Sequence, residues 1–140
     1  MNDMKNVFYC LIFCFWGGFS CRQTDPCLGI EGAWTDGEGQ ELVFMSSDSA
    51  LWLTRFGSHV DTIGFVYRMI CQKSPVLIEW NQFAGGPYSG KTLYGILEWL
   101  SDTSFRVRYE PGLYEQVRPV EFDDAHTLRF RKKDVSQPQR

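Results

Sequence analysis

Short segments in which apolar and polar residues alternate follow one another along most of this chain. In residues 103–110, Phe105, Val107 and Tyr109 alternate with Arg106 and Arg108. Side chains of a β-strand point to opposite faces in turn, so a period of two indicates a strand with one buried face. The pattern predicts strands over residues 30–34, 40–45, 50–56, 63–71, 76–83, 91–100, 103–110, 116–122 and 126–131, the eighth of them the weakest.

Turn-forming residues separate these segments. Residues 35–39, 46–49 and 72–75 are rich in Gly, Asp, Ser and Pro, and Pro111-Gly112 marks a further turn. Short strands joined by tight turns, without a convincing helical stretch, are typical of an antiparallel all-β fold. Closing such a meander into a barrel removes its unpaired edges. The sequence therefore predicts a small antiparallel up-and-down barrel of 8–9 strands.

The N-terminus has a different pattern. Residues 7–16 are all apolar, Lys5 precedes them and small residues follow them. A membrane-spanning helix needs about 20 apolar residues, so this run is too short to be one. A basic start, a short apolar core and a small-residue exit predict a secretory signal peptide over residues 1–20.

Cys21 follows directly after this segment. Gly18-Phe19-Ser20-Cys21 resembles a bacterial lipobox, at which the chain is cut before a cysteine that carries the lipid. The resemblance predicts lipidation of Cys21 and attachment to the membrane of the cell envelope, on the periplasmic face of the outer membrane if the cell has two membranes. Ordinary cleavage after Ser20 is the alternative, and the protein would then be secreted.

The remaining chain suits one domain with little net charge. The formal charge is −3, and the only dense basic run, residues 129–133, fits a solvated terminus better than a nucleic-acid surface. The predicted organisation is a lipidated tether over residues 21–28, the β-barrel domain over residues 29–133 and a disordered tail over residues 134–140.

Cysteine usage fits an exported protein. Cys10 and Cys14 lie inside the predicted signal peptide. If Cys21 carries lipid, Cys27 and Cys71 are the thiols that remain, and an oxidising compartment favours their pairing. We therefore expect a disulfide between Cys27 and Cys71.

Gly32-Ala33-Trp34 at the head of the first predicted strand resembles the G-x-W opening of lipocalins. In that family the Trp packs across the closed end of the barrel, often beneath an Arg from the final strand. The resemblance implies that Gly32 and Trp34 form the closure motif, with Arg129 or Arg131 as the covering cation.

A longer set of motifs resembles a family of small uncharacterised bacterial lipocalin-like domains. The set covers roughly residues 29–132 and consists of Lys73-Ser74-Pro75, Ile78-Glu79, Gly90-Lys91-Thr92, Gly95-Ile96, Val107 and Arg118-Pro119-x-Glu121-Phe122. This resemblance implies a lipocalin-like β fold, often on exported proteins, and it implies no established activity. The chain departs from the family in carrying residues 111–116 before the Arg-Pro pair.

Residues that could carry catalysis are sparse. His59 and His126 are remote in sequence and each lies at a turn, and Cys71 lacks the context of a nucleophile. Residues 85–92 match the spacing of a phosphate loop, but the segment after them is short and interrupted by Gly95. We therefore expect no enzyme activity, no cofactor and no metal site.

Two functions of different class remain. The barrel could bind a small apolar or amphipathic ligand, in which case its cavity lining would consist of Phe44, Trp80, Phe105, Tyr109 and Phe130. Alternatively, the barrel is filled by its own side chains and the protein is a structural or interaction lipoprotein, a scaffold or an inhibitor. Barrels of about 8 strands can do either.

Overall fold

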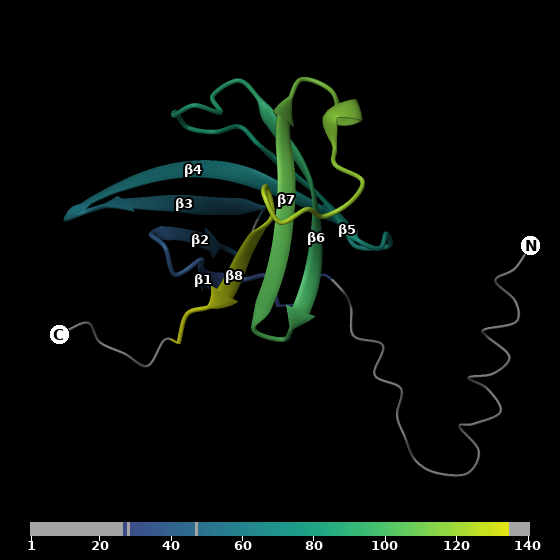
Figure 1. Cartoon of the computed structure of the whole chain (residues 1–140). Coiled ribbons are helices and arrows are strands. Elements are labelled where there is room, and N and C mark those ends of the chain that lie inside the picture. Colours follow the sequence, from purple (N-terminus) through teal and green to yellow (C-terminus); the bar gives the residue numbers. More distant parts are fainter. Residues whose placement is uncertain (1–26, 28, 47, 135–140) are drawn as a thin grey trace, which may run out of the picture.

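Eight antiparallel strands form one closed barrel in which each strand pairs with its neighbours in sequence and the last pairs with the first (Figure 1). The structure is a computed structural model that describes residue 27 and residues 29–46 and 48–134. The strands are β1 (Gly32–Thr35), β2 (Gln40–Phe44), β3 (Ser49–Phe56), β4 (His59–Ile70), β5 (Val76–Asn81), β6 (Thr92–Ser101), β7 (Ser104–Gly112) and β8 (Leu128–Lys132), with a short 3-10 turn, η1 (Glu115–Val117). The predicted all-β up-and-down barrel is confirmed. The predicted signal peptide, Cys21 and residues 135–140 lie outside the described residues.

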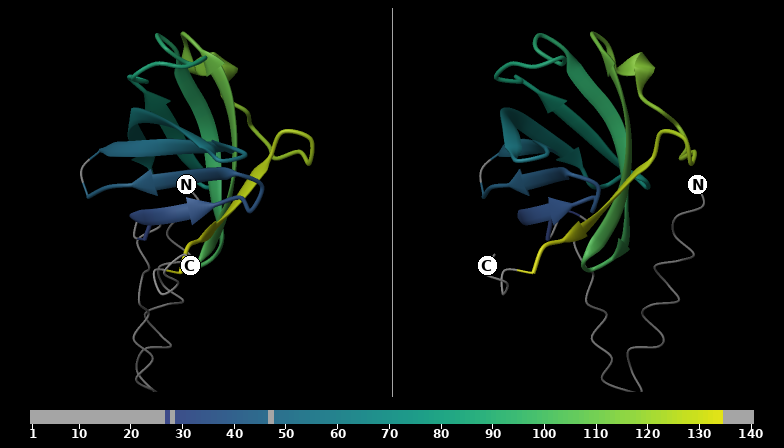
Figure 2. Two further views of the ribbon diagram at one scale, coloured as in Figure 1. Left: turned by 90° about the vertical axis from the view of Figure 1, so that its left-hand side faces the viewer. Right: turned by 60° about the vertical axis from the view of Figure 1, so that its left-hand side comes forward.

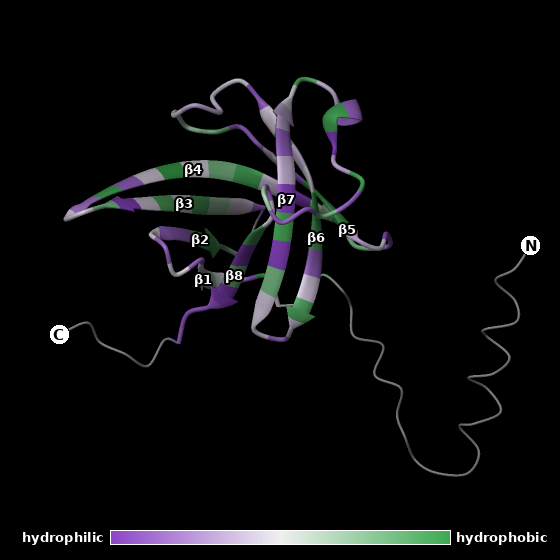
Figure 3. Ribbon diagram, in the orientation of Figure 1, coloured by the Kyte–Doolittle hydropathy of each residue, from purple (hydrophilic) through white to green (hydrophobic). Residues whose placement is uncertain are grey.

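Alternating side chains build the core, as the sequence pattern predicts. In β5, the side chains of Val76, Ile78 and Trp80 are buried, whereas Leu77 and Glu79 between them belong to the outer face. Figure 3 shows the same alternation as changes of colour along the strands. Burial of one face of every strand supplies the apolar interior that a closed barrel needs.

Strand β8 closes the barrel with few pairs. It pairs with β7 from Val107↔Leu128 to Ser104↔Arg131, and with β1 only at Trp34↔Lys132 and Thr35↔Arg131. Leu128, Phe130 and Lys132 therefore share one face of β8, with Phe130 buried and Lys132 exposed at the end of the strand. This register decides which basic residue of β8 lies over the Trp34 ring at the end of the barrel.

The connection between β7 and β8 lies against the outer wall of the barrel (Figure 2). We call this connection, residues 113–127, the strap. The predicted strand over residues 116–122 is wrong, because the strap contains η1 and irregular backbone there. Pro119 has no N–H for a ladder bond, and the Arg118 side chain bonds to the barrel wall, so strand pairing gives way to side-chain attachment.

Strand β4 is longer than its apolar pattern predicts. It begins at His59, where the chain turns through Gly57 at a φ of 62° and pairs Phe56 with His59. Residues 59–62 are mostly exposed on both faces, so this end of the β3–β4 hairpin carries no alternation that could predict it. The hairpin extends beyond the barrel at the far left of Figure 1.

Candidate ligand-binding site

The structure places the five residues predicted to line a cavity in the barrel interior. Phe44, Trp80, Phe105 and Phe130 are at most 3% exposed, and Tyr109 packs against the same core. They fall into two aromatic groups, because the rings of Phe105 and Phe130 stack at 5.5 Å, whereas Trp80 contacts Tyr109 at 5.5 Å and Phe44 at 6.3 Å. A ligand at either position would have to displace rings that already contact one another.

The first group surrounds Trp34, whose side chain is fully buried. Its ring meets Phe105 edge-on with centroids 4.9 Å apart, and Trp99 lies 5.7 Å away. The indole Nε1 donates a buried hydrogen bond of 2.7 Å to the carbonyl oxygen of Ile30. The segment before β1 is thereby held across this end of the barrel, which satisfies the indole donor without water.

The cation over Trp34 is Lys132, whose Nζ lies 5.5 Å from the ring centroid. The expectation that Arg129 or Arg131 would cover this ring is corrected, since Phe130 points into the barrel and both of its neighbours point outward. Arg129 instead lies 3.7 Å from Asp124. Gly32 adopts a φ of 115°, and a Cβ there would lie 3.4 Å from the Lys132 side chain.

The second group lies beneath the loop between β5 and β6, residues 82–91. Tyr88 from this loop stacks on Trp52 of β3, with ring centroids 5.9 Å apart and planes inclined by 21°. The Trp52 indole Nε1 donates to Gln40 Oε1 at 3.1 Å, which fixes the ring beneath Tyr88. Tyr88 is half-buried, so this stack forms the boundary between the aromatic interior and solvent at this mouth of the barrel.

The floor below Tyr88 is aromatic and has one polar group. Tyr109 meets Tyr88 edge-on at 6.4 Å and Trp52 edge-on at 5.9 Å. Burial raises the pKa of the Tyr109 phenol well above its usual value, and its interaction with Tyr88 raises the pKa further. The Tyr109 hydroxyl is therefore neutral over the physiological range and can donate or accept a hydrogen bond.

The loop that carries Tyr88 is anchored at its ends. The Ala84 N–H donates to the Gly64 carbonyl at 2.9 Å, and the Lys91 N–H donates to the Tyr88 carbonyl at 2.9 Å. Gly85 and Gly86 take positive φ angles of 134° and 75°. Glycine adopts these angles without steric strain, so the loop can turn sharply over the mouth.

Arg118 of the strap makes several bonds to the outer wall of the barrel. Its Nη1 donates to the carbonyl oxygens of Ile78 and Gly95 at 2.7 and 2.8 Å, and its Nη2 donates to Glu79 Oε1 at 2.9 Å. The guanidinium carbon also lies 5.5 Å from the Tyr94 ring centroid. A planar guanidinium can serve several acceptors at once, which a lysine ammonium at this site could not.

Further contacts hold the rest of the strap to β7. Arg108 Nη1 donates to the Glu121 carbonyl oxygen at 2.8 Å and lies 2.8 Å from the Asp123 carboxylate. The Arg106 guanidinium stacks over the Phe122 ring at 4.2 Å. Charged side chains on the outer face of β7 therefore attach the strap along its length.

The motifs that carry the family resemblance converge at this attachment. Ile78-Glu79 of β5, Gly95-Ile96 of β6 and Arg118 of the strap are joined by the bonds described above. Ile96 belongs to the outer face of β6 and is 1% exposed. These motif residues thus secure the strap on the barrel wall.

Cys27 and Cys71, the pair predicted to form a disulfide, lie together with Cα atoms 5.6 Å apart. This separation is within the usual range for a disulfide. The pair brings the start of the described chain to the end of β4.

The residues considered for catalysis are separate from one another. His59 lies 3.4 Å from Asp61 and His126 lies 2.9 Å from Asp123, and both histidine side chains are exposed. Residues 85–92 lead into β6, not into a helix, so the match to a phosphate loop lacks its structural context. Among the described residues no group of three or more His, Cys, Asp and Glu side chains could hold a metal. In that same part of the chain, no helix is long and apolar enough to span a bilayer.

Comparison with protein-family models, with curated proteins and with solved structures finds no match for this chain. The fold and the contacts of individual residues are therefore the basis for assigning a function. Sequence interpretation did not identify Tyr88, Lys132 or Trp52 as site residues. The Gly-rich context of Tyr88 was visible, but its stacking partner comes from β3 and has no signal in sequence.

Proposed function

We propose that this protein is an exported, lipid-anchored binding protein that takes a small, flat apolar or amphipathic ligand at the mouth of the barrel. The observation that carries the proposal is the stack of Tyr88 on Trp52. A loop-borne ring there occupies the place that a planar ligand would take. A closed barrel of eight strands is a fold that can hold one small ligand, which agrees with such a role.

Binding at the mouth is favoured over binding deep in the barrel. Trp80 and Phe65 lie 5.3 Å apart below the mouth, and Phe65 stacks on Phe83 at 5.4 Å, so those rings support one another. Tyr88 makes its contacts from a loop with glycines on both sides. Moving Tyr88 aside would expose Trp52 and the neutral Tyr109 hydroxyl, which together suit an amphipathic ligand.

A filled barrel without a small-molecule ligand is the second candidate. It is favoured by the packing around Trp34, where Phe105 and Phe130 occupy the interior. In this case the protein would act as a scaffold or an inhibitor through its outer surface.

Replacing Tyr88 by alanine should distinguish the two functions. We expect this variant of the full chain to bind the probe 1-anilinonaphthalene-8-sulfonate about 2- to 10-fold more tightly, because the probe no longer competes with a stacked ring worth ~0.5–1.5 kcal/mol. Probe fluorescence measures the affinity. Tyr114→Ala is the matched control, since Tyr114 is 71% exposed on the strap.

Native mass spectrometry of the protein purified from its own envelope adds an independent result. A co-purifying small apolar compound, reduced by Trp52→Ala, would support binding at the mouth. The alternative outcome is a ligand-free mass together with equal probe affinity for the parent, Tyr88→Ala and Tyr114→Ala. This outcome would favour the second candidate, a protein with a filled barrel and no small-molecule ligand.

The lipid anchor has a separate test in the intact mass of the mature protein. We expect cleavage between Ser20 and Cys21 and acyl chains on Cys21. The same measurement tests the disulfide, because a Cys27–Cys71 bridge makes the mass before reduction lower by two hydrogens than the mass after it. Cys21→Ser should give an unprocessed or soluble product. An unmodified residue 21 would contradict the anchor, and two reactive thiols in the unfolded, unreduced protein would contradict the bridge.

A further inference from the structure

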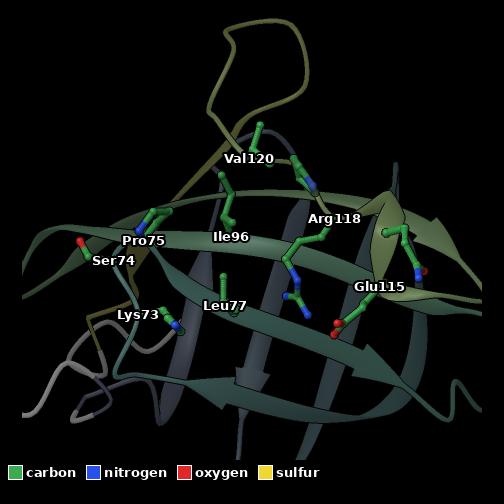
Figure 4. Close-up of a pocket in the computed structure, with 10 residues that line it drawn as sticks. Lys73, Ser74, Pro75, Leu77, Ile96, Glu115, Arg118 and Val120 are labelled. Carbon is green, nitrogen blue, oxygen red and sulfur yellow. The ribbon is translucent and has the colours of Figure 1, made fainter.

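A groove of about 480 Å³ runs along the outer wall of the barrel, between the β4–β5 turn and the strap (Figure 4). Leu77 and Ile96 form its apolar floor. Residues 73–75 border it on one side and residues 115–120 on the other. The groove is separate from the mouth beneath Tyr88, because its lining comes from the opposite faces of the same strands.

The strap beside this groove concentrates exposed apolar side chains. Seven large hydrophobic side chains are exposed in the described residues, and four of them lie within residues 113–120: Leu113, Tyr114, Val117 and Val120. Val120 lines the groove and is 90% exposed. Arg118 fixes this part of the strap to the barrel, so the apolar side chains are presented on a rigid support. Clustered apolar exposure of this kind marks an interaction surface.

Charges of opposite sign face each other across the groove. Figure 4 shows Lys73 on one side and Glu115 on the other, with Leu77 between them. Neither Lys73 nor Glu115 forms an ion pair with any described residue. A surface with a cation on one side, an anion on the other and an apolar floor between is complementary to its own copy after a two-fold rotation.

We propose that a second copy of this chain docks on this groove and forms a two-fold symmetric dimer. Lys73 of each copy then meets Glu115 of the other, and the half-buried Leu77 and the exposed Val120 of both copies are buried between them. This association is additional to ligand binding at the mouth, which uses different residues.

Charge favours a second copy over a lipid surface. Glu115 and Glu121 are exposed on the strap, and carboxylates are repelled by anionic headgroups. Arg118, which lines the groove, is already paired with Glu79, so Lys73 is the one unpaired groove cation set against these two carboxylates among the described residues. In the dimer, Glu115 gains a partner in Lys73 of the other copy. The negative charge of Glu115 therefore opposes binding to an anionic membrane and favours self-association.

Charge reversal provides the test in the full chain, purified with its anchor in detergent. Light scattering with the detergent contribution subtracted should give twice the protein mass of one chain for the parent. Lys73→Glu alone and Glu115→Lys alone should each weaken the dimer at least about tenfold, because each places like charges together. The double variant should restore the parent affinity, as expected when two residues interact directly.

Zero-length carbodiimide coupling gives a second readout, since it joins a lysine to a carboxylate only in contact. In a mixture of ¹⁴N- and ¹⁵N-labelled protein, we expect a mixed-isotope cross-link between Lys73 and Glu115. Lys91→Glu, an exposed charge outside the groove, is the matched control and should leave the dimer unchanged.

Three results would each overturn the dimer. The first is a parent protein that is a monomer at all concentrations, and the second is a double variant that does not recover the parent affinity. The third is a Val120→Ser variant that binds zwitterionic or anionic vesicles less tightly than the parent while its mass in solution is unchanged. Binding of the fluorescent probe to the charge-reversed variants is measured in the same samples. It reports on the proposed site at the mouth separately from the oligomeric state. Loss of the dimer with unchanged probe binding supports both proposals.

Discussion

Replacement of Trp34 by alanine should lower the melting temperature of the protein by on the order of 15 °C. The Trp34 side chain is 0% exposed, packs against Phe105 at 4.9 Å and donates to the Ile30 carbonyl. Truncating a buried Trp costs about 3–5 kcal/mol, because it leaves a cavity and here also a buried carbonyl without its donor. Thermal unfolding followed by circular dichroism measures the change.

Matched variants separate the contributions at this end of the barrel. Trp34→Phe keeps a ring but loses the hydrogen bond to Ile30, so its loss of stability should be intermediate. Lys132→Ala should reduce stability by about 0.5–1 kcal/mol through the cation–π contact, whereas Arg131→Ala should leave it nearly unchanged because Arg131 points outward. A Trp34→Ala variant that melts with the parent would show that another element closes the barrel.

Replacement of Arg118 by alanine should destabilise the protein by about 2–4 kcal/mol and release the strap from the barrel. The Arg118 side chain is 11% exposed and the Glu79 side chain 15% exposed, so removing the guanidinium leaves a poorly hydrated carboxylate with only Arg68, which is 68% exposed and lies 3.5 Å away. The carbonyls of Ile78 and Gly95 lose the same donor. Chemical unfolding measures the stability, and limited chymotrypsin cleavage after Leu113 or Tyr114 reports release of the strap.

Two further variants test the cause of this loss. Glu79→Gln combined with Arg118→Ala should be less destabilised than Arg118→Ala alone, because the side chain that loses Arg118 then carries no charge. Arg129→Ala is the control, since its ion pair with Asp124 is exposed and worth little. Equal stability of the Arg118→Ala and Arg129→Ala variants would show that the strap is held by its apolar contacts.

Local sequence determined the class of the fold because a strand records its two faces at every second residue. The alternation in residues 103–110 predicts β7 and its buried residues Phe105 and Val107, and the structure confirms both. Trp34 is likewise buried as its position in Gly32-Ala33-Trp34 predicts. These features depend on neighbours within a few residues.

The contacts that define the surface and the mouth depend on tertiary structure. Period-two alternation places Phe130 in the core, but only the register of β8 against β1 puts Lys132 over Trp34. The stack of Tyr88 on Trp52 joins the β5–β6 loop to a strand that pairs with neither β5 nor β6.

The strap shows the same limit of local sequence. Its apolar residues predict a strand over residues 116–122, yet the acceptors for Arg118 lie 40 and 23 residues away at Ile78 and Gly95. Sequence by itself therefore determined the strands and their buried faces, which follow from local periodicity. Tertiary structure decided which side chains meet at the mouth and on the outer wall, because closure of the barrel sets the register that brings distant residues into contact.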